Sequence, residues 1–420
     1  MADKIKNPET IGLHGGEYRS DPATTAVAVP IYQTTSYQFK DAKTAANLFG
    51  LKEAGNIYTR INNPTCDILE KRVAALEGGL AAVAVGSGQA ASAFCVQNVC
   101  QAGDNIVSST DLYGGTVNLF KNTLSMQGIE VRFADPKDPK NFEKLTDEKT
   151  RAYYGESCPN PYLRVFPIKE VADIGKKHGI PLIIDNTAAP VICKPLEHGA
   201  TIVMHSLTKY IGGHGTSIGG IIVDSGKFKW QDHKQKFNRL NEPDPSYHGV
   251  VYTEALGEAA FIGRARVVPL RNMGAAISPF NAFLILQGVE TLPLRMDRIC
   301  ENTEIVANHL QSHSKVSWVK YAGLPNHPNH NLVKKYMRSK ASGILTFGIV
   351  GGETSGRKFQ DALKLISRLV NIGDCKTLAC HPASTTHRQL SAKEWESAGV
   401  TEDMIRLSIG IENVEDIITD

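Results

Sequence analysis

Between residues 81 and 223 the chain alternates short apolar runs with helix-like segments, and this alternation constrains the fold more than any other feature. The runs have the length and the Val, Ile and Ala content of buried strands. They cover residues 81–85, 105–109, 129–134, 151–155, 181–184, 201–205 and 219–223. Helix-like segments separate several of them, for example at 114–127 and 168–178. Because strands that alternate with helices run mostly parallel and are covered on both faces, we predict an α/β fold.

The first 60 residues contain many Gly, Pro, Thr and Tyr residues and show only weak periodicity, so we predict that they form an arm. A helix should follow this arm. Asn63 is suited to its N-cap and Pro64 to its first turn, and Gly78-Gly79 should end it.

The pattern changes again after about residue 225, where a polar stretch begins. Beyond it we expect a long helical region near 255–312, a strand at 343–350 and a helix at 355–370. Because 420 residues are too many for one ordinary core, more than one domain is expected. The predicted division is an arm at 1–60, a large domain at 61–265 and a smaller C-terminal α/β domain at 266–420.

The overall composition argues against several classes of partner. The net charge of +3 is nearly balanced and gives no reason to expect nucleic acid or an anionic membrane surface. No apolar run approaches the roughly 18 residues of a membrane span, and the first residues lack the apolar stretch of a secretory signal. The eight cysteines form no C-x-x-C pair, which is typical of free thiols in a reducing compartment. We therefore expect a cytoplasmic enzyme.

Ligands of open parallel sheets bind beyond the carboxyl ends of the strands, so the residues that follow each predicted strand are the candidates for chemistry. Gly86-Ser87-Gly88-Gln89 follows the run at 81–85 and precedes a helix. Free N–H groups at such a helix start favour an anion such as phosphate, although an ordinary strand-to-helix turn explains the same residues. The dinucleotide fingerprint G-x-G-x-x-G is absent, because position 91 is Ala.

Two further strand ends carry a tyrosine and an aspartate. Tyr113, after the run at 105–109, could stack on a flat heterocycle and use its hydroxyl in acid–base chemistry, or it could simply pack in a loop. Asp185 directly follows the apolar run Leu182-Ile183-Ile184, and a carboxylate buried at such a strand end needs a positive partner. A protonated pyridine nitrogen, a structural ion pair and a magnesium ion would each satisfy that need.

The fourth strand end, after the run at 201–205, places two hydroxyls and an amine within four positions. Ser206 and Thr208 could donate hydrogen bonds to a phosphate, and Lys209 could attack an aldehyde if its pKa lies well below the usual value. Taken alone, Lys209 could equally be a surface lysine. The four strand ends together supply what pyridoxal 5'-phosphate requires, because this cofactor has a phosphate, a flat ring, a basic ring nitrogen and an aldehyde. We predict a pyridoxal-phosphate enzyme in which Lys209 carries the cofactor as an imine.

The same residues lie in motifs that resemble the Cys/Met-metabolism family of pyridoxal-phosphate enzymes, which have the aspartate-aminotransferase-like fold type I. The resemblance covers nearly the whole chain. Its motifs are YTRINNPT at 58–65, GSGQAA at 86–91, DLYGGT at 111–116, IIDNT at 183–187, HSLTKYIGGHG at 205–215, HPASTTH at 381–387 and IRLSIGIE at 405–412.

The resemblance implies a role for each candidate residue. Lys209 would form the covalent aldimine, Asp185 would bind the pyridine nitrogen, and Tyr113 would stack on the ring. Asn160, in the loop SCPNP, would help to position the ring. The remaining contacts to the cofactor would come from Ser87, Gly88, Gln89, Ser206 and Thr208.

The resemblance also implies how the substrate and a second subunit take part. Arg406 would clamp the α-carboxylate of the substrate with a planar pair of donors, and Asn371 would assist it. Tyr58 and Arg60 would reach from the arm into the phosphate site of the neighbouring subunit. The expected assembly is a homotetramer formed as a dimer of dimers with shared active sites.

Within the family the chain most resembles the O-acetylhomoserine sulfhydrylase branch, on the segments PDPSYHG at 243–249, 278–296 and 371–390. This implies a transferase of methionine biosynthesis that converts O-acetylhomoserine and a sulfur donor to homocysteine and acetate. Sulfide, methanethiol or a sulfur-carrier protein could be the donor. The alternatives are cystathionine γ-synthase and methionine or cystathionine γ-lyase. Gly115 counts against a dedicated lyase, which typically has cysteine there. A non-catalytic α/β binding protein is the alternative outside this class.

A metal site is not expected. His381 and His387 lie six positions apart, but no third ligand stands at a suitable spacing, so structural histidines in a loop explain them better.

Overall fold

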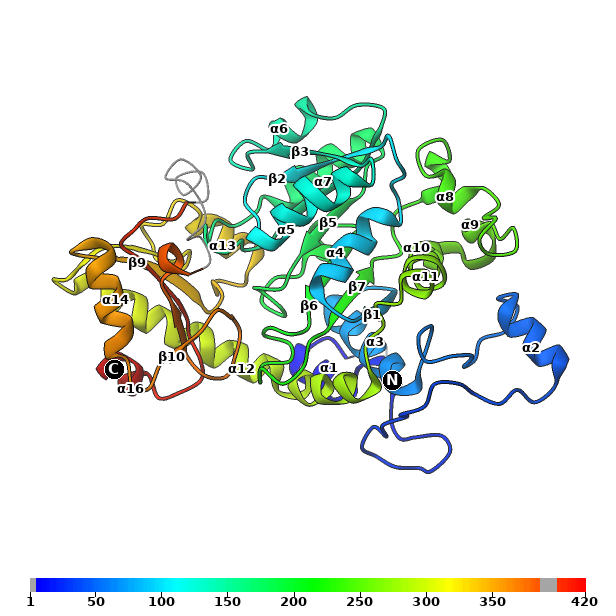
Figure 1. Cartoon of the computed structure of the whole chain (residues 1–420), viewed down its shortest axis with the longest axis horizontal. Coiled ribbons are helices and arrows are strands. Elements are labelled where there is room, and N and C mark those ends of the chain that lie inside the picture. Colours follow the sequence, from blue (N-terminus) through cyan, green and yellow to red (C-terminus); the bar gives the residue numbers. More distant parts are fainter. Residues whose placement is uncertain (1–4, 386–398) are drawn as a thin grey trace.

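The computed structural model describes residues 5–385 and 399–420, and its larger part is a seven-stranded sheet between two layers of helices (Figure 1). The strand order is β1-β7-β6-β5-β4-β2-β3. All neighbouring strands run parallel except β7, which is antiparallel to β1 and to β6. The strands are β1 (Ala81–Val85), β2 (Asn105–Ser109), β3 (Glu130–Ala134), β4 (Thr150–Glu156), β5 (Leu182–Asp185), β6 (Ile202–Ser206) and β7 (Gly220–Asp224). The predicted mostly parallel α/β fold is confirmed.

Alternate residues of these strands enter two separate hydrophobic cores, one on each face of the sheet. In β6, for example, Val203 packs into the core that α3 (Pro64–Glu77), α7 (Ile168–His178) and α12 (Pro279–Ser312) close. Its neighbours Ile202 and Met204 pack into the other core, under α4 (Gly88–Gln97) and α10 (Ala260–Ala265). Burial on both faces explains why the strands read as nearly continuous apolar runs.

Helix α3 begins and ends where the sequence predicts. The Asn63 side chain accepts a hydrogen bond from the Thr65 N–H at 3.0 Å, and Pro64 occupies the first turn. Gly78 ends the helix with φ of 74°, a left-handed conformation that favours glycine. The helix therefore places its buried face, which includes Leu69 and Val73, against the sheet.

The predicted helical region at 255–312 is helical over most of its length, but it is not one helix. Its first part consists of α9 (Tyr252–Leu256) and of α10, which continues through a π-helical turn (Arg266–Leu270) into α11 (Arg271–Met273). Gly257 and Gly274 have positive φ of 55° and 78°, and each interrupts the helical path. The continuous helix is α12, which starts at Pro279 with the Ser278 hydroxyl accepting from the Asn281 N–H at 3.2 Å.

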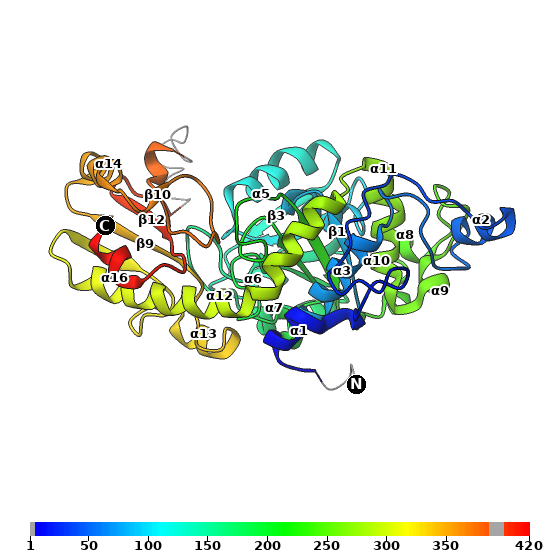
Figure 2. The same cartoon turned by 90° about the horizontal axis from the view of Figure 1, so that it is seen from below.

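Helix α12 runs from beneath the large sheet to a smaller C-terminal sheet (Figure 2). This second sheet has the order β10-β11-β12-β9-β8 and contains the predicted strand at 343–350 as β9. Its strands are β8 (Val316–Lys320), β9 (Ile344–Ile349), β10 (Ser367–Arg368), β11 (Leu378–Cys380) and β12 (Met404–Ser408). The helix predicted at 355–370 is α14 (Gly352–Ala362), so its second half is wrong: the chain turns extended at Leu363 and pairs with β11 through β10.

The N-terminal segment has two parts. Helix α1 (Pro8–His14) packs against the body of the subunit, with Ile11 buried and Gly12 close to the backbone of α12. The following chain, with α2 (Ala42–Phe49), projects away from the body (Figure 1). Val27 in this part is 79% exposed. Only this projecting part behaves as a free arm within one subunit.

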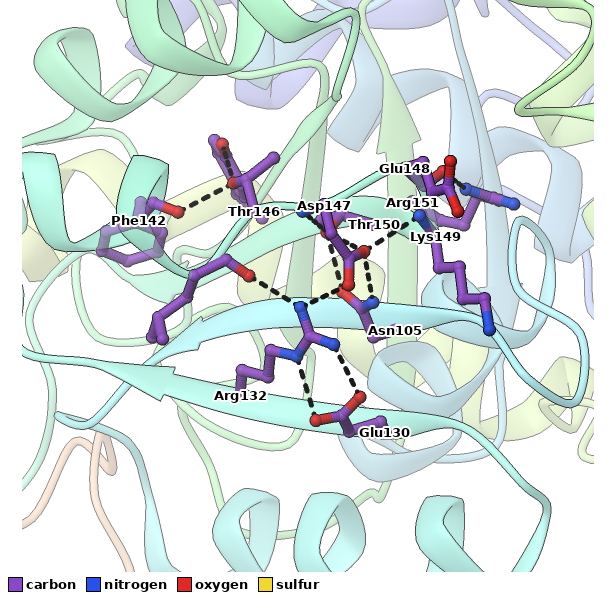
Figure 3. Close-up of polar contacts among 12 residues, drawn as sticks. Asn105, Glu130, Arg132, Phe142, Thr146, Asp147, Glu148, Lys149, Thr150 and Arg151 are labelled. Atoms are coloured by element: carbon purple, nitrogen blue, oxygen red, sulfur yellow. Dashed lines mark hydrogen bonds and ion pairs between the residues drawn. The ribbon is translucent and has the colours of Figure 1, made fainter.

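A polar network joins the amino-terminal ends of β2, β3 and β4, at the sheet edge that holds no candidate site residue (Figure 3). The Arg132 guanidinium forms two hydrogen bonds to Glu130, both at 2.9 Å, and an ion pair with Asp147 at 2.7 Å. Asp147 also accepts from the Asn105 amide at 2.8 Å. Burial raises the pKa of Asp147, but these donors outweigh it and hold the pKa at about 2.

The remaining sequence predictions concern thiols and membrane spans. All eight cysteines are free thiols, as predicted, and all but Cys375 are buried. In the described ranges, no helix is both long and apolar enough to cross a membrane.

Candidate active site

A cavity of about 270 Å³ opens beyond the carboxyl ends of β4, β5 and β6, where the sequence places the candidate residues. The second sheet closes one side of it through the segment around Asn371 and through β12. Eleven of the candidates named above line this cavity: Ser87, Gly88, Gln89, Tyr113, Asn160, Asp185, Ser206, Thr208, Lys209, Asn371 and Arg406. Residues far apart in the sequence thus meet in one pocket.

The start of helix α4 forms one wall and can hold an anion. The Ser87 hydroxyl caps the helix by accepting from the Ala90 N–H at 3.1 Å. A Cβ atom at Gly88 would lie 2.6 Å from the Cβ of Ser206, so only glycine lets the helix start approach β6 this closely. Unpaired N–H groups at the first turn of the helix, with the Ser206 and Thr208 hydroxyls facing the same cavity, suit a phosphate.

Asp185 ends β5 and faces the cavity with an unusual lack of positive partners. One carboxylate oxygen accepts the Thr187 N–H at 2.9 Å. Burial raises the pKa of Asp185. Within the described ranges, no lysine or arginine forms an ion pair with this carboxylate, and no group of three His, Cys, Asp or Glu side chains is arranged to hold a metal. A protonated ring nitrogen would supply the missing partner.

Lys209 lies in the loop after β6 and directs its amine into the cavity. The Nζ atom donates a hydrogen bond to Oδ1 of Asn371. Burial lowers the pKa of Lys209, and the nearby Arg406 cation lowers it further. An amine with a lowered pKa has a larger neutral fraction and is a better nucleophile and base.

Arg406 enters the cavity from β12 of the second sheet and is largely buried. Its Nη2 donates to the Asn371 carbonyl at 3.1 Å, and Nη1 lies 3.5 Å from Oδ1 of Asn160. The Nε atom is buried and has no hydrogen-bond partner in the part of the chain that the structure describes. Since these neighbours are neutral oxygens, the guanidinium keeps its full charge for an anionic group such as a carboxylate.

Tyr113 lies beyond β2 at the rim of the cavity, 53% exposed. Its backbone N–H donates to Oε1 of Glu156 at 2.6 Å. A Cβ atom at Gly115 would come within 2.4 Å of the Tyr113 ring, so glycine at this position leaves room for the ring. The side chain is therefore positioned to cover a flat group bound between α4 and Asp185.

Two candidates lie outside this pocket. Tyr58 and Arg60, both on the projecting arm, are not among the lining residues. The Arg60 guanidinium sits 5.4 Å from the centre of the Tyr58 ring and donates to the Arg271 carbonyl of the same subunit. Their use in a second subunit stays a prediction.

The sequence analysis missed Glu156, which ends β4 as Asp185 ends β5 and also lines the cavity. The signal that identified Asp185, an acidic residue directly after a buried strand, was present here too.

Cys158 lines the cavity as well, and burial raises the pKa of its thiol to about 12, so it carries no thiolate. His381 is buried and hydrogen-bonds through Nε2 to the Glu402 carbonyl at 2.7 Å. His387 lies outside the described residues.

The residues present fit pyridoxal phosphate in charge and in shape. The anion cradle, the exposed ring, the carboxylate without a cation and the amine with a lowered pKa all face one cavity. Three of these features follow β6, β5 and β2, and the fourth, the start of α4, lies against Ser206 at the end of β6, so one aromatic cofactor with its phosphate can reach all four.

Comparison with known proteins agrees with this geometry. The family model for Cys/Met metabolism PLP-dependent enzymes matches residues 9–420. The chain is 55% identical to O-acetyl-L-homoserine sulfhydrylase of Leptospira meyeri, over 98% of this chain and 95% of the relative. It is 49% identical to homocysteine synthase of Schizosaccharomyces pombe, over 98% and 96% of the two chains.

A crystal structure from Campylobacter jejuni, named as an O-acetylhomoserine (thiol)-lyase, superposes with a TM-score of 0.95 at 41% identity. The superposition covers 99% of this chain and 98% of that one, and that structure contains N'-pyridoxyl-lysine-5'-monophosphate.

Proposed function

The chain belongs to the Cys/Met metabolism family of PLP-dependent enzymes, and on that premise we propose that it replaces the acetoxy group of O-acetylhomoserine with a sulfur nucleophile. The products would be homocysteine and acetate. The names of relatives that are 49–55% identical over nearly the full length support this reaction. The observation that carries the proposal is the pocket itself. The Lys209 amine, the Asp185 carboxylate and the Arg406 guanidinium face the same space, and among the described residues neither Asp185 nor Arg406 forms an ion pair.

The cofactor would be held by residues of the large sheet. We assign its aldehyde carbon to Lys209, its ring nitrogen to Asp185 and its ring face to Tyr113, with Asn160 at the ring edge. Its phosphate would be bound by the start of α4 and the loop after β6, through Ser87, Gly88, Gln89, Ser206 and Thr208. When bound there, pyridoxal phosphate supplies an electron sink for negative charge at the substrate Cα.

The chain's own residues would bind the amino acid and move its protons. Arg406 would pair with the α-carboxylate, and Asn371 would fix the orientation of both Arg406 and Lys209. The Lys209 amine would accept the Cα proton and then mediate proton transfer at Cβ, so that acetate can leave from Cγ. The Tyr113 hydroxyl would assist as a general acid or base at the rim of the pocket.

A panel of substrates tests this function. Purified holoenzyme should release acetate from O-acetylhomoserine when the correct sulfur donor is supplied. Sulfide, methanethiol and a thiocarboxylated carrier protein are tried in turn. The amino-acid product should be homocysteine with sulfide, homocysteine after hydrolysis with the carrier protein, and methionine with methanethiol. Greater activity with O-succinylhomoserine and cysteine would contradict the proposal and indicate a cystathionine γ-synthase. Release of a thiol from methionine or cystathionine without O-acetylhomoserine turnover would instead indicate a γ-lyase.

The proposed active unit is a dimer within a homotetramer, in which Tyr58 and Arg60 complete the phosphate site of the neighbouring subunit. Their exposed position on the projecting arm, outside the pocket of their own subunit, supports this.

We also propose the division into an arm at 1–60, a large domain at 61–265 and a C-terminal domain at 266–420, and a cytoplasmic location.

Complementation between subunits tests the shared site. Arg60→Ala and Lys209→Ala proteins should each be nearly inactive. In a mixed dimer, one of the two sites would combine an intact Lys209 with an intact Arg60 from the other subunit. Co-expression with two different tags should therefore recover about half of the wild-type activity per mixed dimer, whereas an inactive mixed dimer would contradict the shared site.

A further inference from the structure

Glu156 occupies a central place in the row of strand ends that forms the pocket. The register of the sheet pairs it directly with Asp185 of the neighbouring parallel strand. Paired residues of parallel strands point to the same face, and the strands lie about 4.8 Å apart. On the other side of β4 lies β2, which leads into the Tyr113 loop. Glu156 thus stands between the carboxylate proposed for the ring nitrogen and the ring proposed to stack on the cofactor.

The contacts of Glu156 are to backbone N–H groups and not to cations. Its Oε1 accepts the Tyr113 N–H at 2.6 Å, and its carboxyl also accepts a hydrogen bond from the Asn160 backbone. The side chain is buried, and within residues 5–385 and 399–420 no lysine or arginine forms an ion pair with it. One side chain therefore joins two loops that come from different parts of the chain and both reach the pocket.

We propose that Glu156 is a positioning residue that acts as a neutral carboxylic acid: it holds Tyr113 and Asn160 in place around the cofactor ring and leaves the negative charge of the site on Asp185. This inference rests on the pyridoxal-phosphate site and on the residue assignments proposed above, and it does not depend on which amino acid the enzyme uses.

The surroundings explain which of the two carboxyls keeps the proton. Burial raises the pKa of Glu156 well above the usual value, and the adjacent Asp185 raises it further. Burial raises the pKa of Asp185 too, but hydrogen bonds from Thr187 act in the opposite direction. Two neighbouring carboxyls whose environments separate their pKa values in this way carry one charge between them. The other titratable groups that face Glu156 are Asp111, Tyr154 and Cys158.

Asp111 does not change this outcome. It forms an ion pair with Arg164 at 3.1 Å, which balances its charge at the start of the Tyr113 loop. Burial raises the pKa of both Tyr154 and Cys158, so these two groups are neutral near Glu156. The local balance therefore contains one carboxylate for the ring nitrogen and one neutral acceptor for the loop N–H groups.

Two substitutions separate positioning from charge. Glu156→Gln keeps an uncharged oxygen that can accept the Tyr113 N–H, so this holoenzyme should have wild-type activity within about threefold. Glu156→Ala removes the acceptor, and displacement of Tyr113 should lower kcat by about 10- to 100-fold. The circular dichroism of the visible cofactor band, which depends on the orientation of the ring, should change in Glu156→Ala and remain unchanged in Glu156→Gln.

Asp224→Ala is the matched control. Asp224 is also a fully buried carboxyl with a backbone donor, the Gly226 N–H at 2.9 Å, but it lies at the opposite edge of the sheet because β7 runs antiparallel. This variant should lower the melting temperature and leave the dichroism of the cofactor band unchanged.

The outcomes can be told apart. A Glu156→Gln enzyme with altered dichroism and a loss of activity above tenfold would show that the ionised carboxylate is required and would overturn the proposal, even if Glu156→Ala fails to fold. Wild-type dichroism and kcat in Glu156→Ala would overturn the positioning role. If wild-type protein binds the cofactor but does not use O-acetylhomoserine, the proposed function fails, and the dichroism experiment still decides the role of Glu156.

Discussion

Replacing Arg406 should separate binding of the substrate carboxylate from every other function of the pocket. The guanidinium is buried, and among residues 5–385 and 399–420 its Nε has no hydrogen-bond partner and its two Nη atoms contact neutral oxygens. A carboxylate bound by two of its N–H groups would form two charge-assisted hydrogen bonds. Each contributes about 1.5–3 kcal/mol, so Arg406→Ala should lose about 3–6 kcal/mol. At about 1.4 kcal/mol per factor of ten, kcat/KM should fall by about 10²–10⁴.

The kcat/KM of Arg406→Lys should lie between that of Arg406→Ala and that of the wild type. Lysine keeps the charge but offers a point donor in place of a planar pair, so one of the two hydrogen bonds is lost and kcat/KM should fall by about 10- to 100-fold. Most of the loss should appear as a higher KM, because the carboxylate is bound both before and during the chemical steps. The cofactor band should be retained in both variants, since the role proposed for Arg406 is to bind the substrate.

Steady-state kinetics with O-acetylhomoserine and sulfide measure these effects, and Arg132→Ala is the control. Arg132 forms a comparable set of polar contacts at the far edge of the sheet (Figure 3), so its loss should lower the melting temperature and leave KM unchanged. A kcat/KM for Arg406→Ala within threefold of the wild type would refute the assignment of Arg406 to the substrate carboxylate.

Other parts of the structure lead to three further predictions. Lys209→Ala should abolish both turnover and the visible cofactor band, and an active, yellow Lys209→Ala protein would disprove the assignment of the aldehyde to this residue. Gly88→Ala would place a Cβ 2.6 Å from Ser206, and such overpacking costs about 1–3 kcal/mol, so the dissociation constant of the cofactor, measured by titration of the apoenzyme, should rise about 10- to 100-fold. The third concerns acid stability: the pKa of Asp147 is held at about 2, below its usual 3.8, so its contribution is complete above about pH 4 and is lost as the pH falls through 2. Because this carboxylate is 39% exposed, Asp147→Asn should lose only about 1 kcal/mol of unfolding free energy at pH 7, and denaturant titrations of the two proteins should converge near pH 2.

The sequence predicted the large sheet and the helices α3 and α7 well, and the breaks in the chain that leads into α12 poorly, for a physical reason. A strand buried on both faces must be apolar at nearly every position, and this leaves a clear signal, as in Ile202–Ser206. The segment before α12 is apolar as well, but the positive φ values of Gly257 and Gly274 divide it into short helices. Whether a glycine interrupts a helix or is tolerated within it depends on tertiary contacts, which periodicity does not contain.

In the candidate site, too, some residues could be identified from the sequence pattern and others could not. Residues directly after strands, such as Asp185 and Lys209, could be found because strand ends of a parallel sheet converge. Arg406 and Asn371 come from the second sheet, and only family resemblance connected them with the pocket. Glu156 was missed although it follows the same rule as Asp185, because its value as an acceptor for the Tyr113 N–H depends on which strands are neighbours.

The strand order explains why these functions meet at all. Along the sheet, β6, β5, β4 and β2 are consecutive neighbours, and their ends present in turn Lys209, Asp185, Glu156 and Tyr113. The distance across this row is that of a few strand spacings of about 4.8 Å, which one aromatic cofactor with its phosphate can bridge. The residues proposed to bind the substrate come from the second sheet, since Arg406 and the Asn371 carbonyl close the pocket from β12 and the segment before β11. It follows that within one subunit the proposed contacts to the cofactor come from the large sheet, whereas the proposed binding of the substrate carboxylate requires the two sheets to keep their relative position along α12.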